Sequence, residues 1–233
     1  MPDILGFIPA RGGSKGIPRK NLFPVMGKPL LQYTLEAAAG SRHLSRRMLS
    51  SEDEKIRDFA ARHGADIRYR RPPELATDEA TTVDTVLHAL EWLEARNELP
   101  EIVVLLQPTS PLRTSQHIDA AIEQFLQSGC SSLISVHPMT EHPWKCLDVS
   151  DDGWRFLARP PAKITRRQEY SNNYYTINGA LYIATPAFIR ETRGFVEENE
   201  TTLFFMPPSA GVDIDELPDV FQTEAHLRSV ALG

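Results

Sequence analysis

The sequence predicts an α/β fold with a doubly wound, mostly parallel sheet. Short apolar runs alternate with amphipathic segments of helical spacing from Ile4 to Val136, the order typical of such sheets. The run at 102–106, Ile-Val-Val-Leu-Leu, is apolar throughout, as in a parallel strand covered on both faces by helices. A chain of 233 residues suffices for one large domain, or for one domain with a small appended element.

Each element of the first part has its own local signal. Pro29 and Gly40 bracket one helix, Ser51 is expected to cap the next before Gly64 ends it, and Gly129 ends a third. Up to residue 136 we expect strands at 4–8, 47–50, 66–69 and 102–106. Helices are expected between and after them, at 30–39, 51–63, 77–96 and 115–128.

The pattern changes after Val136, and residues 137–178 are expected to form an insertion. This segment holds a predicted hairpin, with strands at 145–149 and 154–157 joined by a turn at Asp152-Gly153. A basic, aromatic stretch follows at 159–175. The main domain, residues 1–136 and 179–233, resumes with a strand at 180–184, a helix at 186–192, a strand at 203–206 and a final helix.

Composition excludes several classes of protein. A net charge of −6 argues against binding nucleic acid through bulk electrostatics. No apolar run approaches the roughly 20 residues that a membrane-spanning helix needs. Cys130 and Cys146 lack C-x-x-C spacing, and the first residues do not resemble a signal peptide, so we expect a cytoplasmic protein with reduced thiols.

The loop after the first strand has the composition of a polyphosphate site. Glycines at 12, 13 and 16 allow a tight turn with exposed N–H groups, and Arg11, Lys15, Arg19 and Lys20 can neutralise phosphate oxygens. The spacing matches neither G-x-x-x-x-G-K-[ST] nor G-x-G-x-x-G. The alternative is a solvated basic turn.

Acidic residues near the C-terminus suggest a metal site. Asp213 and Asp215 are two apart, so in an extended segment both carboxylates point to one side. A hard cation such as Mg²⁺ would relieve their repulsion. The alternative is a strand end entering a helix whose first turn favours acids.

Other polar residues follow predicted strands or lie in the insertion. Gln107 and Arg113 flank a proline-rich turn that either faces a sugar or phosphate or simply turns the chain. Arg71 either contacts a nucleotide or is a solvated surface residue. In the insertion, three cations occur among aromatic residues: Lys145, Arg166 and Arg167. They either bind an acidic sugar or form the charged rim of a subunit interface.

Five blocks, in this order, together resemble the acylneuraminate cytidylyltransferases, also called CMP-sialic acid synthetases. They are ARGGSKGIPRKNL at 10–22, RPPELATD at 71–78, QPTSPLR at 107–113, NGALYI at 178–183 and DID at 213–215. The resemblance covers nearly the whole chain. It implies a Rossmann-like nucleotidyltransferase fold in which the insertion serves dimerisation.

The implied reaction is transfer of CMP from CTP to the anomeric hydroxyl of a nine-carbon acidic keto sugar, with release of diphosphate. Arg11, Lys20 and Asp213 are the implied catalytic residues, and Asp213 and Asp215 the Mg²⁺ (or Mn²⁺) ligands. The nucleotide is implied to contact Arg11, Gly12, Ser14, Lys15, Lys20, Asn21, Arg71 and Thr82. The sugar is implied to contact Gln107 and, from a partner in a homodimer with a shared sugar site, Lys145, Arg166 and Arg167.

The sequence leaves the sugar open, because Thr176-Ile177 stands where some sialic acid enzymes have an arginine. Legionaminic acid or another acidic keto sugar is an alternative substrate. A catalytically silent nucleotide-binding regulator is an alternative from a different class.

Overall fold

The computed structural model describes residues 2–159 and 174–232, and its centre is a six-stranded sheet of order β10-β6-β9-β5-β1-β4. The strands are β1 (Ile4–Pro9), β4 (Arg46–Ser50), β5 (Ile102–Leu105), β6 (Ser132–Pro138), β9 (Tyr175–Ala184) and β10 (Thr201–Phe205). β1 is parallel to β4 and β5, and β10 is parallel to β6. The predicted doubly wound, mostly parallel sheet is confirmed.

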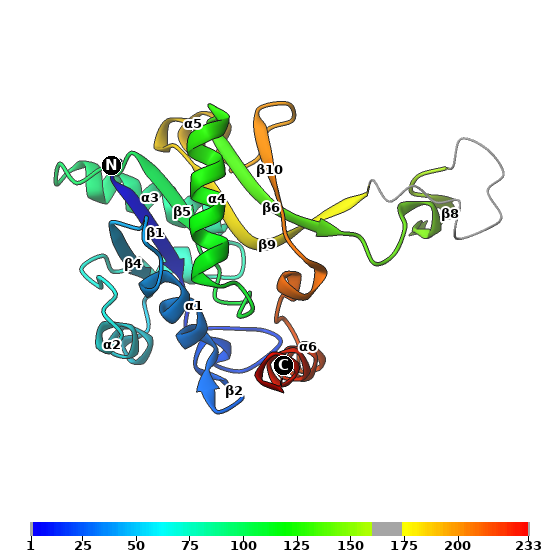
Figure 1. Ribbon diagram of the computed structural model, residues 1–233, viewed down its shortest axis with the longest axis horizontal. Coiled ribbons are helices and arrows are strands. Elements are labelled where there is room, and N and C mark those ends of the chain that lie inside the picture. The colour runs from blue at the N-terminus through cyan, green and yellow to red at the C-terminus, as the bar shows by residue number, and fades with distance from the viewer. Residues whose placement is uncertain (1, 160–173, 233) are drawn as a thin grey trace.

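Helices cover both faces of the sheet (Figure 1). One face packs against α1 (Leu30–Ala39), α2 (Glu54–Arg62) and α4 (Ser115–Ser128), and the other against α3 (Thr82–Glu94) and α5 (Pro186–Thr192). Alternation along β1 supplies both cores, because Ile4 and Ile8 belong to the first and Leu5 and Phe7 to the second. This two-sided burial explains the apolar runs in the strands.

One strand differs from the others in direction: β9 is antiparallel to both β5 and β6. The chain leaves the sheet at the end of β6 and returns directly through β9, with pairing from Ser132↔Ala184 out to Pro138↔Tyr175. Antiparallel neighbours need no crossover helix, so this arrangement suits a segment that departs and comes back at one end of the sheet.

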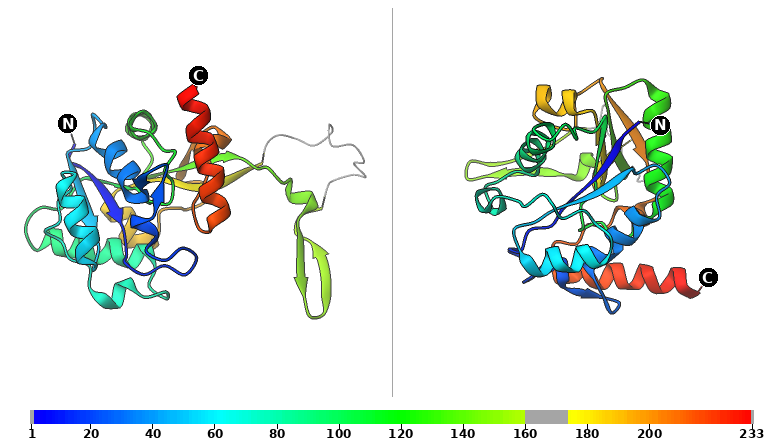
Figure 2. Two further views of the ribbon diagram at one scale, coloured as in Figure 1. Left: turned by 90° about the horizontal axis from the view of Figure 1, so that it is seen from below. Right: turned by 90° about the vertical axis from the view of Figure 1, so that its left-hand side faces the viewer.

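A hairpin projects from the rest of the protein on this connection (Figures 1 and 2). It consists of β7 (Leu147–Ser150) and β8 (Gly153–Phe156), preceded by the 3₁₀ turn η3 (Pro143–Lys145). The predicted hairpin is confirmed, although its turn lies at Asp151-Asp152, one residue earlier than expected. Arg166 and Arg167 lie outside the described residues.

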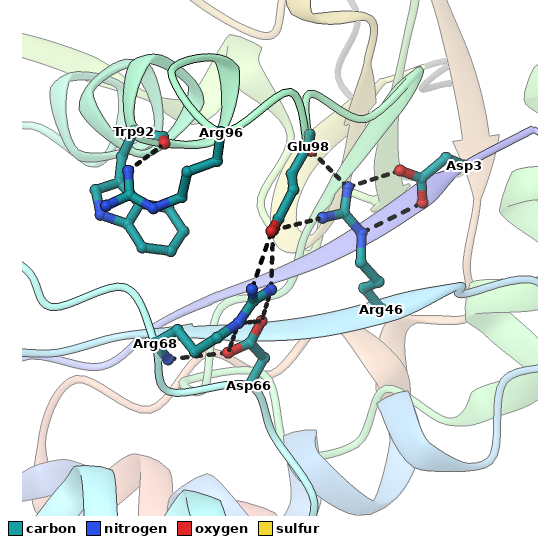
Figure 3. A network of polar contacts seen from close by, with 7 residues as sticks. All are labelled: Asp3, Arg46, Asp66, Arg68, Trp92, Arg96 and Glu98. Atoms are coloured by element: carbon teal, nitrogen blue, oxygen red, sulfur yellow. Dashed lines mark hydrogen bonds and ion pairs between the residues drawn. The ribbon is translucent and has the colours of Figure 1, made fainter.

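The strand expected at 66–69 is absent, and that prediction is wrong. Only an isolated parallel bridge between Met48 and Asp66 forms there. The segment is held by side chains instead: the Arg68 guanidinium bonds both Asp66 and Glu98, and Glu98 also faces Arg46 (Figure 3). The carbonyl oxygens of Ile67 and Tyr69 accept hydrogen bonds from the Arg57 guanidinium, both at 2.9 Å, so the segment is held without a continuous ladder.

Two helix starts were also predicted wrongly. Asp53, not Ser51, caps α2, because its carboxylate accepts from the Ile56 N–H at 3.0 Å. α3 begins at Thr82 rather than at residue 77, since Thr81 accepts from the Asp84 N–H at 3.0 Å and ends the preceding loop. The shorter helix leaves residues 77–81 as a loop after the 3₁₀ turn η2 (Pro73–Ala76).

The remaining elements lie around the N-terminal loop and the C-terminus. They are η1 (Lys20–Leu22), β2 (Pro24–Val25), β3 (Lys28–Pro29), η5 (Pro208–Gly211) and α6 (Leu217–Leu232). α6 packs beside β2, so the C-terminal helix lies against the segment that follows the glycine-rich loop (Figure 1). In the part of the chain that the structure describes, no helix is long and apolar enough to cross a membrane.

Replacing Leu181 by alanine tests the core. Leu181 on β9 is fully buried in the first core, so truncation should lower the free energy of unfolding by about 2–5 kcal/mol. Leu126→Ala is the matched control, because Leu126 is 47% exposed and its loss should cost less than about 0.5 kcal/mol. Urea unfolding measures both, and equal losses would contradict the assignment of β9 to the core.

Candidate active site

A pocket of about 510 Å³ opens where β1 and β5 end and their loops meet. Ligands in open α/β sheets bind at this edge, beyond the carboxyl ends of parallel strands. The pocket brings together most of the predicted site residues: Arg11, Ser14, Lys15, Lys20, Asn21, Arg71, Thr82, Gln107, Asp213 and Asp215.

The basic N-terminal loop is closed on itself by Asn21. The Asn21 side chain is 9% exposed, and its Nδ2 donates to the Arg11 carbonyl oxygen at 2.8 Å. The loop is also tied to the end of β4, where the Ala10 N–H donates to the Ser50 carbonyl oxygen at 2.9 Å. Gly12 does not line the pocket, and its N–H donates to Glu52 Oε1 at 2.7 Å. The loop is therefore fixed before any ligand binds.

Gly16 allows the loop to touch the C-terminal acidic segment. A Cβ atom at this position would overlap the carbonyl oxygen of Asp215. The next residue, Ile17, is 1% exposed and packs with Ile214 in a separate apolar cluster. Glycine is thus required here by close approach of two backbones nearly 200 residues apart in the chain.

The acidic segment alternates between buried and exposed side chains. Ile214 is fully buried, and its N–H donates to the Thr109 carbonyl oxygen at 2.8 Å. Asp213 and Asp215 consequently lie on the pocket side, as their i, i+2 spacing predicts. Desolvation by the pocket walls raises the pKa of Asp213, a hydrogen bond with Thr109 lowers it, and the nearby Asp215 charge raises it further.

Carboxylates of the chain hold the cations of the pocket. Lys20 Nζ contacts Asp215 Oδ1 at 2.8 Å and the Ile214 carbonyl oxygen at 2.9 Å. Arg11 Nη2 and Lys15 Nζ both contact Asp78, at 2.8 and 3.2 Å. The sequence alone suggested no role for Asp78. The only signal in the sequence is its position as the last residue of the 71–78 block.

Arg71 lines the pocket but is only 5% exposed, so the interpretation as a solvated surface arginine is wrong. Its Nε donates to Ser50 Oγ and its Nη2 to the Ser50 carbonyl oxygen, both at 3.0 Å. Burial lowers the pKa of Arg71, and the charge of Glu52 opposes that effect. Arg71 is thereby held against the end of β4 in one orientation.

Arg113 does not face a substrate, and that suggestion is wrong. It is 2% exposed, and its Nη1 donates to the carbonyl oxygens of Gln107 at 3.0 Å and Ala180 at 2.8 Å. Its Nη2 donates to Thr34 Oγ1 at 2.6 Å. The buried guanidinium therefore fixes the Gln107 loop to β9 and α1. Gln107 itself lines the pocket beside Gly179.

Lys145 lies on the projecting connection, not in the pocket of its own chain. Next to it, the rings of His142 and Trp144 are 4.4 Å apart, and His142 and Tyr174 are 4.7 Å apart. This aromatic cluster stiffens the base of the hairpin.

An open α/β sheet with a basic glycine loop facing two carboxylates across one pocket defines a nucleotidyltransferase. The chain belongs to the cytidylyltransferase family, whose model matches residues 5–176. It is 34% identical over 223 residues to CMP-N,N'-diacetyllegionaminic acid synthase of Legionella pneumophila, covering 95% of this chain and 94% of that protein.

Two further similarities agree with this family. The N-acylneuraminate cytidylyltransferase of Streptococcus agalactiae is 33% identical, over 94% of this chain and 52% of the relative. Among solved structures, CMP:2-keto-3-deoxy-manno-octonic acid synthetase complexed with CTP has a TM-score of 0.70 at 15% identity, covering 98% of this chain and 99% of that one. At that identity the structural likeness supports the fold alone.

Replacing Gly16 by alanine tests the contact between the basic loop and the acidic segment. The added methyl group must push the loop away from Asp215, so we expect CTP to bind at least about tenfold more weakly, or about 1.4 kcal/mol. Gly194→Ala is the control, because a Cβ there meets nothing closer than 3.7 Å. Calorimetric titration with CTP measures both, and unchanged affinity for Gly16→Ala would contradict the close approach.

Proposed function

We propose that this enzyme transfers CMP from CTP to the anomeric hydroxyl of a nine-carbon acidic keto sugar and releases diphosphate. The observation that carries the proposal is the convergence, in one pocket, of the basic glycine loop, Gln107 and the two aspartates. The names of the two relatives, a CMP-diacetyllegionaminic acid synthase and an N-acylneuraminate cytidylyltransferase, support this substrate class.

The residues divide into two groups by their place in the pocket. Arg11, Lys15 and Lys20 supply positive charge for the triphosphate, with Ser14 and Asn21 on the same loop. Arg71 and Thr82 also line the pocket and are proposed to contact the nucleotide, whereas Gln107 lies on another loop and is proposed to face the sugar. Phosphoryl transfer depends mainly on positioning and on stabilising charge, and this arrangement suits both needs.

Asp213 and Asp215 are proposed to hold Mg²⁺, or Mn²⁺, together with phosphate oxygens of the substrate. Both line the pocket, and the charge of Asp215 contributes to the raised pKa of Asp213, so a cation between them would stabilise both carboxylates. Bound metal would neutralise charge on the reacting phosphates. In the described part of the chain no group of three or more His, Cys, Asp or Glu residues is placed to bind a metal without substrate.

We further propose a homodimer in which the hairpin completes the sugar site of the partner. Its apolar side chains are exposed, including Val149 at 72%, Trp154 at 64% and Leu157 at 67%, and a second copy would cover them. Lys145 lies on the same arm, and Arg166 and Arg167 follow it in the chain. A cytoplasmic location, where CTP is available, is part of the same proposal.

The reaction is tested by measuring diphosphate release from CTP and Mg²⁺ with N-acetylneuraminic, legionaminic, pseudaminic and Kdo acids. Release with at least one nine-carbon acid is expected, and the preferred acid identifies the substrate. Release with Kdo alone would overturn the nine-carbon assignment. Release with none of the four, from protein that binds CTP, would instead favour the nucleotide-binding regulator.

Asp213→Asn separates the role of this carboxylate in function from its effect on stability. We expect turnover to fall at least a hundredfold, because the metal loses a charged ligand. The pKa of Asp213 is higher in the folded protein than in the unfolded chain, so protonation of Asp213 stabilises the folded state. That stabilisation is lost as pH rises through the folded-state pKa, where the carboxylate ionises. At pH 7 the neutral asparagine should therefore leave the melting temperature unchanged or higher.

The same shift predicts the pH dependence of the wild type. As pH falls through the raised pKa of Asp213 in the metal-free enzyme, protons compete with Mg²⁺ for this carboxylate, so the rate at subsaturating Mg²⁺ should decline. Steady-state rates and thermal melts from pH 5 to 8 provide both readouts. Near-normal turnover in Asp213→Asn, or a large drop in its melting temperature, would remove Asp213 from the proposed role.

A further inference from the structure

Each of the three loop cations assigned to the triphosphate is bound to a carboxylate of this chain. Asp215 holds Lys20, and Asp78 holds both Arg11 and Lys15. Asp215 belongs to the proposed metal site, which accounts for its place in the pocket. Asp78 has no such role, and its position requires a separate explanation.

The geometry at Asp78 resembles that of a bound phosphate. Its Oδ1 lies 2.8 Å from Arg11 Nη2, and its Oδ2 lies 3.2 Å from Lys15 Nζ. One anion thus bridges a guanidinium and an ammonium through separate oxygens, as a phosphate group does. Hydrogen bonds from Lys15 and Arg11 lower the pKa of Asp78, so the carboxylate is charged at neutral pH.

The loop that carries Asp78 belongs to the wall of the pocket. Thr77 and Thr81 line the same pocket, and Arg11 Nη1 donates to the Thr77 carbonyl oxygen at 2.7 Å. Arg11 is therefore held by a backbone contact that does not involve the Asp78 charge. Removing that charge should leave the guanidinium in place.

The contact is also weak enough to exchange. The side chain of Lys15 is 77% exposed and that of Asp78 is 41% exposed. Ion pairs of such exposure are weak, because water and salt screen them. A triphosphate, with several negative charges, can displace a single carboxylate from these two cations.

We propose that Asp78 is an internal competitor of the triphosphate. It binds Arg11 and Lys15 in the empty pocket, yields them to CTP, and takes them back as diphosphate departs. Asp78 is thus a positioning residue that acts through two substrate-binding cations and lowers their affinity for both CTP and product. The inference rests on the proposed function, since it requires a triphosphate in this pocket.

The test is calorimetric titration of Asp78→Asn with inorganic tripolyphosphate in metal-free buffer. Asparagine keeps one oxygen as an acceptor for Arg11 but removes the charge. We expect tripolyphosphate to bind about three- to tenfold more tightly than to the wild type, from the loss of two exposed ion pairs. The gain should shrink as salt concentration rises.

Glu94→Gln is the matched control. It removes the same charge from an exposed ion pair, Glu94 Oε2 to Arg190 Nη2 at 2.7 Å, outside the pocket. Its affinity for tripolyphosphate should equal that of the wild type. A comparable gain in Glu94→Gln would show that net charge alone is responsible and would overturn the role of Asp78.

Turnover supplies a readout that a merely structural contact would not move. In Asp78→Asn the KM for CTP and the inhibition constant of diphosphate should fall together, with a lower kcat where product release limits the rate. Equal or weaker tripolyphosphate binding by Asp78→Asn would overturn the inference while leaving the proposed function intact. Failure of both the wild type and Asp78→Asn to bind tripolyphosphate would also overturn the inference, whereas the diphosphate-release assay decides the proposed function separately.

Discussion

The active site depends on a contact between two segments that lie nearly 200 residues apart in the sequence. The glycine loop after β1 and the segment before α6 meet where Gly16 lies against the Asp215 backbone. Ile17 and Ile214 are buried together in the apolar cluster beneath this contact. Because both isoleucines are removed from water, the contact is stabilised independently of any ligand. Lys20, Asp213 and Asp215 then reach one pocket from opposite ends of the chain.

This contact concentrates charge, which affects both stability and function. Burying Ile214 forces its two acidic neighbours toward the pocket, where desolvation and mutual repulsion raise the pKa of Asp213. Lys20 compensates in part by contacting Asp215. The buried Arg113 guanidinium likewise serves the site, since it holds the loop that carries Gln107. Such arrangements are expected where a site is prepared for charged substrates rather than for stability alone.

Much of the fold could be predicted from the sequence, because apolar periodicity and glycine or proline signals are local. The helix at 30–39 and the hairpin beyond residue 145 are examples. The direction of β9 could not be predicted, since it depends on where the chain returns to the sheet. The expected strand at 66–69 failed because Arg57 takes the carbonyl oxygens of Ile67 and Tyr69, while the Arg68 side chain is drawn to Asp66 and to the distant Glu98 (Figure 3). Among site residues, the glycine-rich, basic composition of the loop identified its cations. The orientation of the side chains separated Gln107 from the inward-facing Arg113, and Asp78 was found only through its contacts.

The central claim, that one nucleotide site is assembled across the contact between the glycine loop and the segment before α6, is tested most directly by hydrogen exchange. Amide exchange would be compared with and without CTP and Mg²⁺, in the absence of sugar. The account predicts that peptides covering residues 11–21 and 212–216 gain protection together and over the same range of CTP concentration. Protection confined to residues 11–21, with 212–216 unchanged at saturating CTP, would contradict it.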